Sequence, residues 1–165
     1  MSLPGKMALR KQNKEQRLAQ TDELTGFHNR LYFQENYGDA GLFMTMRYKS
    51  VAVMDVDHFI ESCDPAEREE VIRRIAALIR DRLGEKCETF RWGENTFVSL
   101  MEWSMEFGSE ICRELCEKVE QDGKVTISVG ITDVRLTETI KKHYHRAIQG
   151  CYQVKEMGGN GVKRV

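Results

Sequence analysis

The sequence predicts an α+β (mixed α/β) fold, and three observations support this prediction. Strand-like and helix-like segments alternate unevenly along the chain. Two of the strands, near residues 87–91 and 97–101, are joined by a short turn as in a hairpin. The chain has 165 residues, of which 41% are hydrophobic, and this is enough for one domain with its own core. A regular doubly wound sheet is not expected.

Charge and cysteine content exclude several functional classes. The 25 basic and 26 acidic residues are spread along the chain, so no basic footprint for a nucleic-acid partner is expected. No apolar run reaches the length of a membrane span and no signal-peptide pattern is present, which favours a cytoplasmic segment without membrane insertion. The five cysteines lack CxxC spacing. Cys112 and Cys116, one helical turn apart, leave a metal pair open, but small buried hydrophobes in a reducing cytosol are favoured.

The first twenty residues are predicted to lie outside the domain. Met1–Gly5 is interpreted as a tag remnant, and the polar stretch up to Gln20 as a connector helix from something upstream. It has too few apolar residues to bury itself, and a frayed terminus is the alternative. Cap-type residues at Thr21 and Asp22 then open a domain that is expected to span residues 21–165.

The first half of that domain predicts two helices and a central strand. A helical pattern runs from Asn29 to about Tyr37. The almost continuous apolar run before Asp55 and Asp57 predicts a strand buried on both faces. Its two carboxylates are two residues apart and should therefore point to the same face. An apolar stripe over residues 71–83 predicts the next helix.

The second half continues with a hairpin, two helices and two strands. Apolar residues every four positions predict a helix over residues 107–119, and residues 125–131 read as a strong strand. A last helix is expected from about Glu138 to Met157, because a glycine-rich stop follows it. Residues 162–165 could add an edge strand.

Two places in this pattern suggest phosphate or metal chemistry. A glycine followed by carboxylates at a hairpin turn lets a polyphosphate approach the backbone and holds a divalent cation. Here Gly93 is followed by only one carboxylate, Glu94. An aspartate at the end of a buried strand, such as Asp55, is a common cation ligand. The alternative for Asp55 is a solvated strand end.

Five separated motifs together resemble the GGDEF family, the diguanylate cyclase domains of bacterial signalling. Any one of them is weak, but all five occur in the order and spacing of the family. In this chain they are Asp22-x-Leu24-Thr25-Gly26-Phe27-x-Asn29-Arg30, Asp55-Val56-Asp57-His58-Phe59, Arg91 to Phe97, Thr126 to Ile131, and Ala147 to Lys155 with Gly158 and Asn160.

The resemblance implies a fold and an activity. The fold would be a central, mostly antiparallel sheet flanked by helices, similar to the ferredoxin-like palm of nucleotide cyclases and polymerases. Members of the family condense two GTP molecules into cyclic di-GMP at the interface of two domains. Magnesium activates the attacking hydroxyl and neutralises phosphate charge.

The signature hairpin departs from the family pattern. If Arg91 and Phe97 fix the frame, Gly93 matches the first signature glycine and Glu94 replaces the second. Asn95 then replaces the metal-binding acid, and Thr96 the following glutamate. A frame shifted by one would make Glu94 the metal acid, but the period of two in a strand would then turn Phe97 out of the core.

The residues expected to read guanine are also changed. The family has a guanine-reading asparagine eight positions after the first strand-end aspartate, and here that position is Cys63. The segment Pro65–Glu70, before the helix over residues 71–83, is about three residues shorter than in the family. Glu69 and Glu70 are the nearest candidates for the second guanine reader, and Ile60 stands where a lysine is expected.

The closing helix keeps one of two phosphate-binding residues. Lys155 matches the lysine of the family, but the arginine expected four residues later is Gly159. The inhibitory RxxD motif would fall at Gly84 to Cys87, and neither end carries the required charge. Arg82 is nearby but out of register.

The resemblance thus implies a partial triphosphate site and assigns no catalytic residue. Asp55 is the candidate metal ligand and Glu94 a weaker one. No resident cofactor is expected, and Mg²⁺ would enter only with a nucleotide. The candidate nucleotide-binding residues are His58 and Phe59, through the backbone amides around them, and Cys63, Gly93 and Lys155.

The leading hypothesis is a degenerate GGDEF domain of a cyclic di-GMP signalling protein, without cyclase activity, acting as a regulatory or interaction module. The alternatives are a divergent cyclase that uses Glu94, and an allosteric GTP-binding domain without turnover. The expected partners are other domains of the same polypeptide, either an upstream sensor or a phosphodiesterase-type output. A homodimer and membrane tethering of a larger protein are also compatible with the sequence.

Overall fold

A six-stranded mixed sheet forms the centre of the domain in the computed structural model, which describes residues 3–38 and 47–165. Its strands are β1 (His28–Asn29), β2 (Ser50–Val56), β3 (Cys87–Arg91), β4 (Thr96–Met101), β5 (Ile127–Asp133) and β6 (Gly161–Arg164). Their order is β1-β3-β4-β2-β5-β6. The inner pairs are antiparallel, and the two outer pairs, β1 with β3 and β5 with β6, are parallel. The predicted fold class is therefore confirmed.

Helices cover both faces of the sheet. The helices are α1 (Leu3–Ala19), α2 (Arg30–Tyr37), α4 (Phe59–Ser62), α5 (Pro65–Leu83), α6 (Met105–Asp122) and α7 (Ile140–Glu156), with a short 3₁₀ turn, η1 (Gly84–Lys86). Helices α5 and α6 share one core cluster with the sheet, while α2 and α7 share the other. Strand β2 contributes to both clusters, which confirms that it is buried on both faces.

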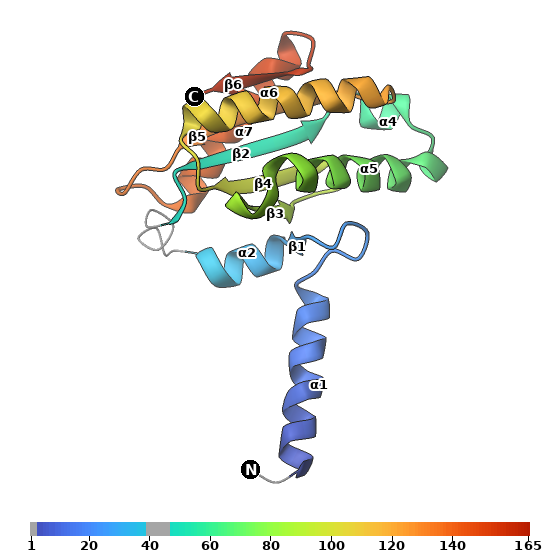
Figure 1. The fold of residues 1–165 in the computed structure, drawn as a ribbon, viewed down its shortest axis with the longest axis vertical. Helices are drawn as coiled ribbons and strands as arrows, with labels where there is room; N and C mark the ends of the chain where they lie inside the picture. Colours follow the sequence, from blue (N-terminus) through green and yellow to red (C-terminus); the bar gives the residue numbers. More distant parts are fainter. Residues whose placement is uncertain (1–2, 39–46) are drawn as a thin grey trace.

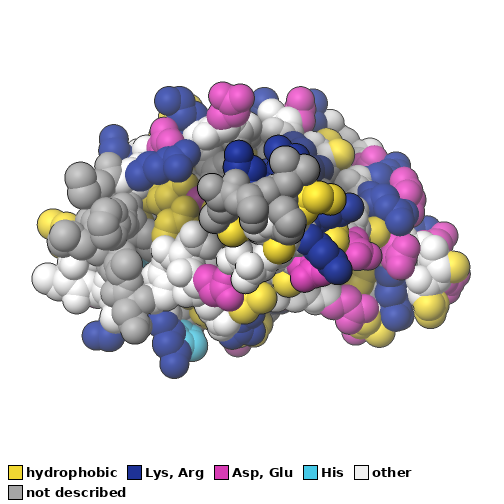
Figure 2. All heavy atoms as spheres, turned by 90° about the horizontal axis from the view of Figure 1, so that it is seen from below, with side chains coloured by type: hydrophobic (Ala, Val, Ile, Leu, Met, Phe, Trp, Pro, Cys, Tyr) yellow, Lys and Arg dark blue, Asp and Glu magenta, His cyan; other side chains and the backbone are white. Residues whose placement is uncertain are grey.

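Helix α1 projects away from the domain, and Figure 1 shows it as a blue stem below the sheet. Its described side chains are almost all exposed, as the polar sequence predicts. Residues 1–2 of the predicted tag remnant lie outside the described residues, and the boundary at residue 20 remains a prediction. Seen along this helix, the molecule has Lys or Arg and Asp or Glu side chains interspersed (Figure 2). No helix of the described residues is long and apolar enough to cross a membrane.

Helix α5 begins at Pro65, so the prediction of a helix from residue 71 was too short. Asp64 is the N-cap, Pro65 occupies the first turn, and the Glu67 carboxylate accepts a hydrogen bond from the Asp64 backbone N–H (3.4 Å). The apolar pattern does not extend into the first turn of α5, because the residues of that turn are mostly polar. Asp-Pro-x-Glu was the overlooked signal.

The five cysteines are free thiols, and four of them are buried. Burial raises the pKa of the Cys116 thiol to about 12, and it raises the pKa of Cys112 as well. Buried, protonated thiols are poor nucleophiles and poor metal ligands. The structure therefore supports the interpretation of Cys112 and Cys116 as small core residues.

Helix α7 lies unusually close to strand β5 at two glycines. A Cβ atom on Gly130 would lie 1.8 Å from the Ala147 carbonyl oxygen and 2.5 Å from the Cys151 backbone nitrogen. Gly150, on the facing side of α7, would place its own Cβ 3.3 Å from the Gly130 Cα. The absence of side chains at both positions allows the helix to approach the sheet, which positions the C-terminal end of α7 near the end of β2.

His143 on α7 is buried, with 1% of the residue exposed. Its Nε2 accepts a hydrogen bond from the Arg135 backbone N–H (2.7 Å), and its Nδ1 lies 2.8 Å from the Thr139 carbonyl oxygen. These contacts fit a neutral ring with its proton on Nδ1. The ring thus holds the loop between β5 and α7.

We expect His143 to make the domain less stable in mild acid. Burial lowers the pKa of His143 from its ordinary value of 6.5, although Glu138 at 3.9 Å opposes this. The unfolded chain therefore binds the proton first, and the free energy of unfolding should fall between about pH 7.5 and pH 5.5, by at most about 1.4 kcal/mol. Urea unfolding at both pH values measures the change. His143→Gln should reduce this pH dependence and exposed His145→Gln should keep it; the reverse would contradict the assignment.

Candidate functional site

The turn between β3 and β4 lies where these two strands meet, beside the C-terminal end of the neighbouring strand β2. Arg91 pairs with Phe97 across the hairpin, and the Trp92 backbone N–H donates to the Thr96 carbonyl oxygen (2.9 Å). Phe97 is 1% exposed, so its side chain lies in the core as the period of two predicts. Thr96 pairs with Asp55 on the neighbouring strand.

Arg91 fixes the conformation of this turn. Its Nε donates to the Gly93 carbonyl oxygen (2.7 Å) and its Nη2 to that of Glu94 (2.5 Å). Its Nη1 forms an ion pair with Asp22 (3.2 Å), whose carboxylate also accepts hydrogen bonds from Thr25. The motif before α2 and the hairpin are thus joined by one guanidinium.

Lys155 reaches from the end of α7 to the end of β2. Its Nζ lies 3.1 Å from Asp57 Oδ1, 3.2 Å from the Val56 carbonyl oxygen and 3.5 Å from Asp55 Oδ2. Both carboxylates therefore point to one side, as their spacing predicts. The ammonium group has three donors, and these three oxygens surround it.

Asp57 accepts more hydrogen bonds than Asp55 does, and only 3% of the residue is exposed. Besides Lys155, it accepts hydrogen bonds from Ser128 Oγ (2.6 Å), Thr126 Oγ1 (2.7 Å) and the Asn160 backbone N–H (2.9 Å). Burial alone would raise its pKa, but the hydrogen bonds outweigh burial and hold the pKa of Asp57 below its usual value. Asp57 therefore joins β2, β5 and the glycine-rich segment after α7.

Asp55 has a different environment. Burial raises the pKa of the Asp55 carboxyl above its usual value, and the nearby Lys155 and Thr96 only partly oppose this. Its carboxylate accepts a hydrogen bond from Thr96 Oγ1 (3.2 Å) and lies 3.5 Å from the Lys155 ammonium. The charged form of Asp55 is thus less favoured than that of Asp57.

The side chains around Asp55 do not fit a magnesium ion. The Asn95 side chain uses its Nδ2 to donate to the Val56 carbonyl oxygen (3.3 Å), and the Glu94 side chain is exposed. Mg²⁺ needs oxygen ligands in near-octahedral geometry, and an ammonium 3.5 Å from Asp55 opposes a second cation. Among residues 3–38 and 47–165, no group of three or more His, Cys, Asp or Glu could hold a metal ion.

The remaining predicted nucleotide-binding residues are only partly brought together. A cavity of about 190 Å³ is lined by Asp57, His58, Glu61, Lys155 and Gly159. Phe59 and Cys63 are 3% and 2% exposed and pack in the core, so their side chains do not line this cavity. Burial also raises the pKa of the Cys63 thiol. The buried position of Cys63 does not support the prediction that its side chain contacts a ligand.

Substituted positions around this cavity differ in their roles. Ile60 is 54% exposed and does not fill the cavity. Glu69 and Glu70 are exposed and pair with Arg73 on the surface of α5. Gly159 has φ +79°, and a Cβ there would lie 2.7 Å from Asp57 Oδ2. Replacing this glycine with an arginine would thus require both the backbone and Asp57 to move.

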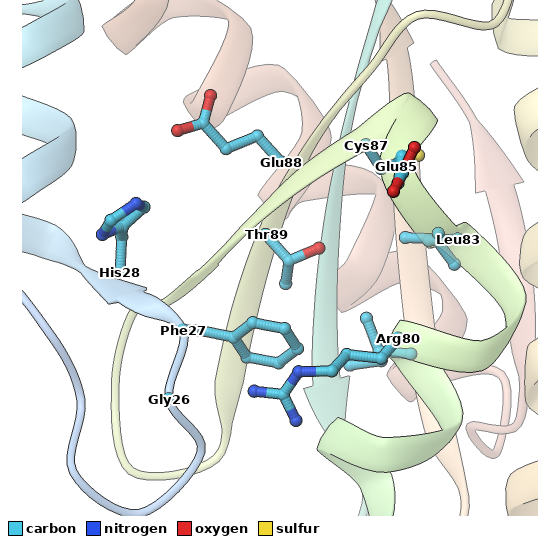
Figure 3. Close-up of a pocket in the computed structure, with 11 residues that line it drawn as sticks. Gly26, Phe27, His28, Arg80, Leu83, Glu85, Cys87, Glu88 and Thr89 are labelled. Atoms are coloured by element: carbon cyan, nitrogen blue, oxygen red, sulfur yellow. The ribbon is translucent and has the colours of Figure 1, made fainter.

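A larger cavity, of about 400 Å³, lies where the inhibitory RxxD motif would be expected, beside Gly84 and Cys87. Figure 3 shows Arg80 beside the Phe27 ring, and the guanidinium carbon lies 4.3 Å from the ring centroid. Glu85 and Glu88 are also among the residues that line the cavity, but the Glu88 carboxylate accepts hydrogen bonds from the Tyr37 and Tyr48 hydroxyls in the other core cluster. Arg82 instead pairs with Glu114 on α6. The Arg80 guanidinium also donates to the Thr25 carbonyl oxygen, so in this structure it contacts the segment before α2.

Sequence reasoning missed two groups of residues that organise the site. The hydroxyls of Thr126 and Ser128 hold Asp57, and their spacing of two at the start of β5 was a detectable signal. The pair between Asp22 and Arg91 was also missed. These residues lie in motifs that carry the family resemblance, but their pairing depends on the folded chain.

This sheet, with a hairpin turn and two carboxylates at the end of its central strand, defines a GGDEF-like class. The family model described as "Diguanylate cyclase, GGDEF domain" matches residues 19–161. The chain therefore belongs to the GGDEF family. No curated protein matches the sequence.

Several solved structures are similar in fold. The coiled coil and GGDEF domain of DgcB from Caulobacter crescentus, in complex with c-di-GMP, is 23% identical with a TM-score of 0.84, and 100% of each chain is covered. The GGDEF domain of FimX from Pseudomonas aeruginosa is 20% identical with a TM-score of 0.77, covering 88% of this chain and 99% of that one. The diguanylate cyclase SiaD from Pseudomonas aeruginosa, with its activator SiaC, is 22% identical with a TM-score of 0.79, covering 99% and 69%.

Proposed function

We propose that this chain is a degenerate GGDEF domain of a bacterial cyclic di-GMP signalling protein and that it regulates or binds other domains without cyclising GTP. The observation that supports this best is the position of the Lys155 ammonium between Asp55, Asp57 and the Val56 carbonyl. A lysine held by two carboxylates is a weak partner for a triphosphate. The position aligned with the metal-binding acid is also an amide, Asn95, turned to Val56.

The contacts at the start of the domain support a regulatory role. The Asn29 side chain donates to the Ala19 carbonyl oxygen (2.8 Å), and the Asn29 backbone N–H to that of Gln20 (2.9 Å). Asp22, between these elements, pairs with Arg91 in the hairpin. A displacement of α1 would therefore be transmitted to the signature turn by a short series of hydrogen bonds.

The partners proposed here are domains of the same polypeptide and a second copy of the chain. The exposed polar helix α1 suits a connector, and the similar DgcB structure contains a coiled coil together with its GGDEF domain. SiaD was solved with an activator protein, which shows an interaction partner for that relative. We propose a cytoplasmic location, as expected for a domain that belongs to bacterial second-messenger signalling.

Incubation of the protein with GTP and Mg²⁺ or Mn²⁺ tests this proposal. We expect no cyclic di-GMP above the level of the protein-free reaction, as measured by chromatography, with an active GGDEF domain as positive control. Turnover that disappears in Asp55→Asn would overturn the proposal and favour the divergent cyclase. Calorimetric titration with GTP and ATP separates the third alternative, since saturable heat without product would indicate an allosteric GTP site.

A further inference from the structure

A separate cavity lies on the side of the sheet that α2 and α7 cover. Its volume is about 320 Å³, and its lining combines residues of α2, the signature turn and the first two turns of α7. None of its lining residues belongs to the Asp57 and Lys155 cavity described above. The site is thus independent of the residues expected to bind a nucleotide.

Three aromatic rings form one part of its wall. The Trp92 ring is 4.9 Å from Phe33 in an edge-to-face arrangement and 4.9 Å from Tyr144 with an interplanar angle of 30°. Phe33 is buried, whereas Trp92 and Tyr144 are partly exposed where they line the cavity. Partly exposed aromatic rings suit contact with another flat ring, either stacked or edge-to-face.

Two cationic side chains and one imidazole form another part of the wall. The Arg30 guanidinium carbon lies 4.8 Å from the centroid of the Trp92 ring, and exposed Lys141 and His145 come from α7. Within the described part of the chain, none of these three has an acidic group within 4.0 Å. The N-terminal end of a 17-residue helix adds positive potential at the same place. The cavity therefore favours negative charge.

We propose that this cavity binds a small planar aromatic anion, with its ring against Trp92 and Tyr144 and its carboxylate near Arg30 and Lys141. The volume equals that of about ten water molecules in the liquid. It accommodates one or two fused rings with a carboxylate and is too small to enclose a cyclic dinucleotide. The ligand would contact both the first residue of α2 and the signature turn, and its binding does not depend on GTP turnover.

Titration with indole-3-carboxylate, followed by ¹H–¹⁵N NMR of the protein, tests the proposal. The chain has two tryptophans, and Trp103 lies in the other core cluster, packed edge-to-face on Phe107 (5.4 Å). We expect a saturable shift of the Trp92 indole N–H resonance while that of Trp103 stays unchanged. Neutral indole-3-carboxamide should bind about tenfold more weakly, because it lacks the charge.

Matched charge variants assign the binding to this wall. Arg30→Gln and Lys141→Gln should each weaken binding by about tenfold. Lys142→Gln is the control, because Lys142 is the exposed neighbour on α7 that does not line the cavity. An unchanged Trp103 resonance verifies that each variant is folded.

Three results would overturn the proposal. The first is the absence of a saturable Trp92 shift at millimolar probe, and the second is equal affinity for the carboxylate and the carboxamide. The third is the same affinity in Lys141→Gln and Lys142→Gln, which would place the probe elsewhere.

Discussion

Replacement of Asp57 by Asn should destabilise the domain by about 3–5 kcal/mol, whereas Asp55→Asn should change its stability by less than about 1 kcal/mol. The two aspartates are two residues apart and share Lys155 as a partner. Asp57 is 3% exposed and accepts four hydrogen bonds, including the one from Lys155. An amide at this position would turn an N–H₂ group toward some of these donors and leave the Lys155 charge without its closest partner.

The direction of the two pKa shifts explains why Asp55 should differ. The pKa of Asp57 is lowered, since its hydrogen bonds outweigh burial. Its charge thus stabilises the fold above the unfolded pKa of 3.8, and this contribution is lost as the pH falls through the lower folded value. Burial raises the pKa of Asp55, so the fold disfavours its charge and removal of that charge is tolerated.

Urea unfolding of both variants near pH 7 measures the difference. A loss of 3–5 kcal/mol is a large part of the stability of an ordinary domain, so Asp57→Asn should be partly unfolded or have a much lower midpoint. Equal losses in the two variants would contradict the assignment of Asp57 as the structural carboxylate. Any role of Asp55 in GTP turnover would be seen in the GTP assay with Asp55→Asn, and not in the unfolding measurement.

Gly130→Ala should prevent the normal docking of α7 on the sheet and cost about 3 kcal/mol or more. The added Cβ would lie 1.8 Å from the Ala147 carbonyl oxygen, and backbone atoms cannot rotate away as a flexible side chain can. The helix must therefore move outward, which also withdraws Lys155 from the carboxylates at the end of β2. The expected result is a lower thermal midpoint and faster amide exchange in α7 and β5.

Gly93→Ala is the matched control for this substitution. The atom nearest to a Cβ on Gly93 is Thr96 Oγ1 at 3.7 Å, an ordinary contact. The change should stay within about 0.5 kcal/mol, although Gly93 aligns with a signature glycine of the family. If Gly93→Ala were as damaging as Gly130→Ala, the close approach of α7 would not be the cause.

Most of the sheet was predictable because its strands have strong local patterns. The apolar run at residues 51–56 identified β2, and the Gly93-Glu94-Asn95 turn identified the hairpin. The sequence was less informative where local patterns are weak. Strand β3 carries little alternation and is defined by its pairing with β4 and β1, while the first turn of α5 is polar and defined by its cap.

The sequence predicted which residues belong to the candidate site, but it did not predict how their side chains contact one another. Family motifs indicated Asp55, Gly93 and Lys155, but they gave no reason to expect that Lys155 is held by both aspartates. They also gave Cys63 a ligand-facing position, although it lies in the core. Exposure and pairing depend on neighbours that are far apart in the chain.

By itself, the sequence determined the GGDEF fold, because the motifs of the family are local residue patterns. It also predicted that Asn95 and Thr96 stand where the family has acidic residues. Only the tertiary structure decided what the retained residues do. Lys155 and Val56 are 99 residues apart, and they meet because two glycines let α7 approach β5. Such a contact depends on the packing of a helix against a sheet, which no local pattern specifies.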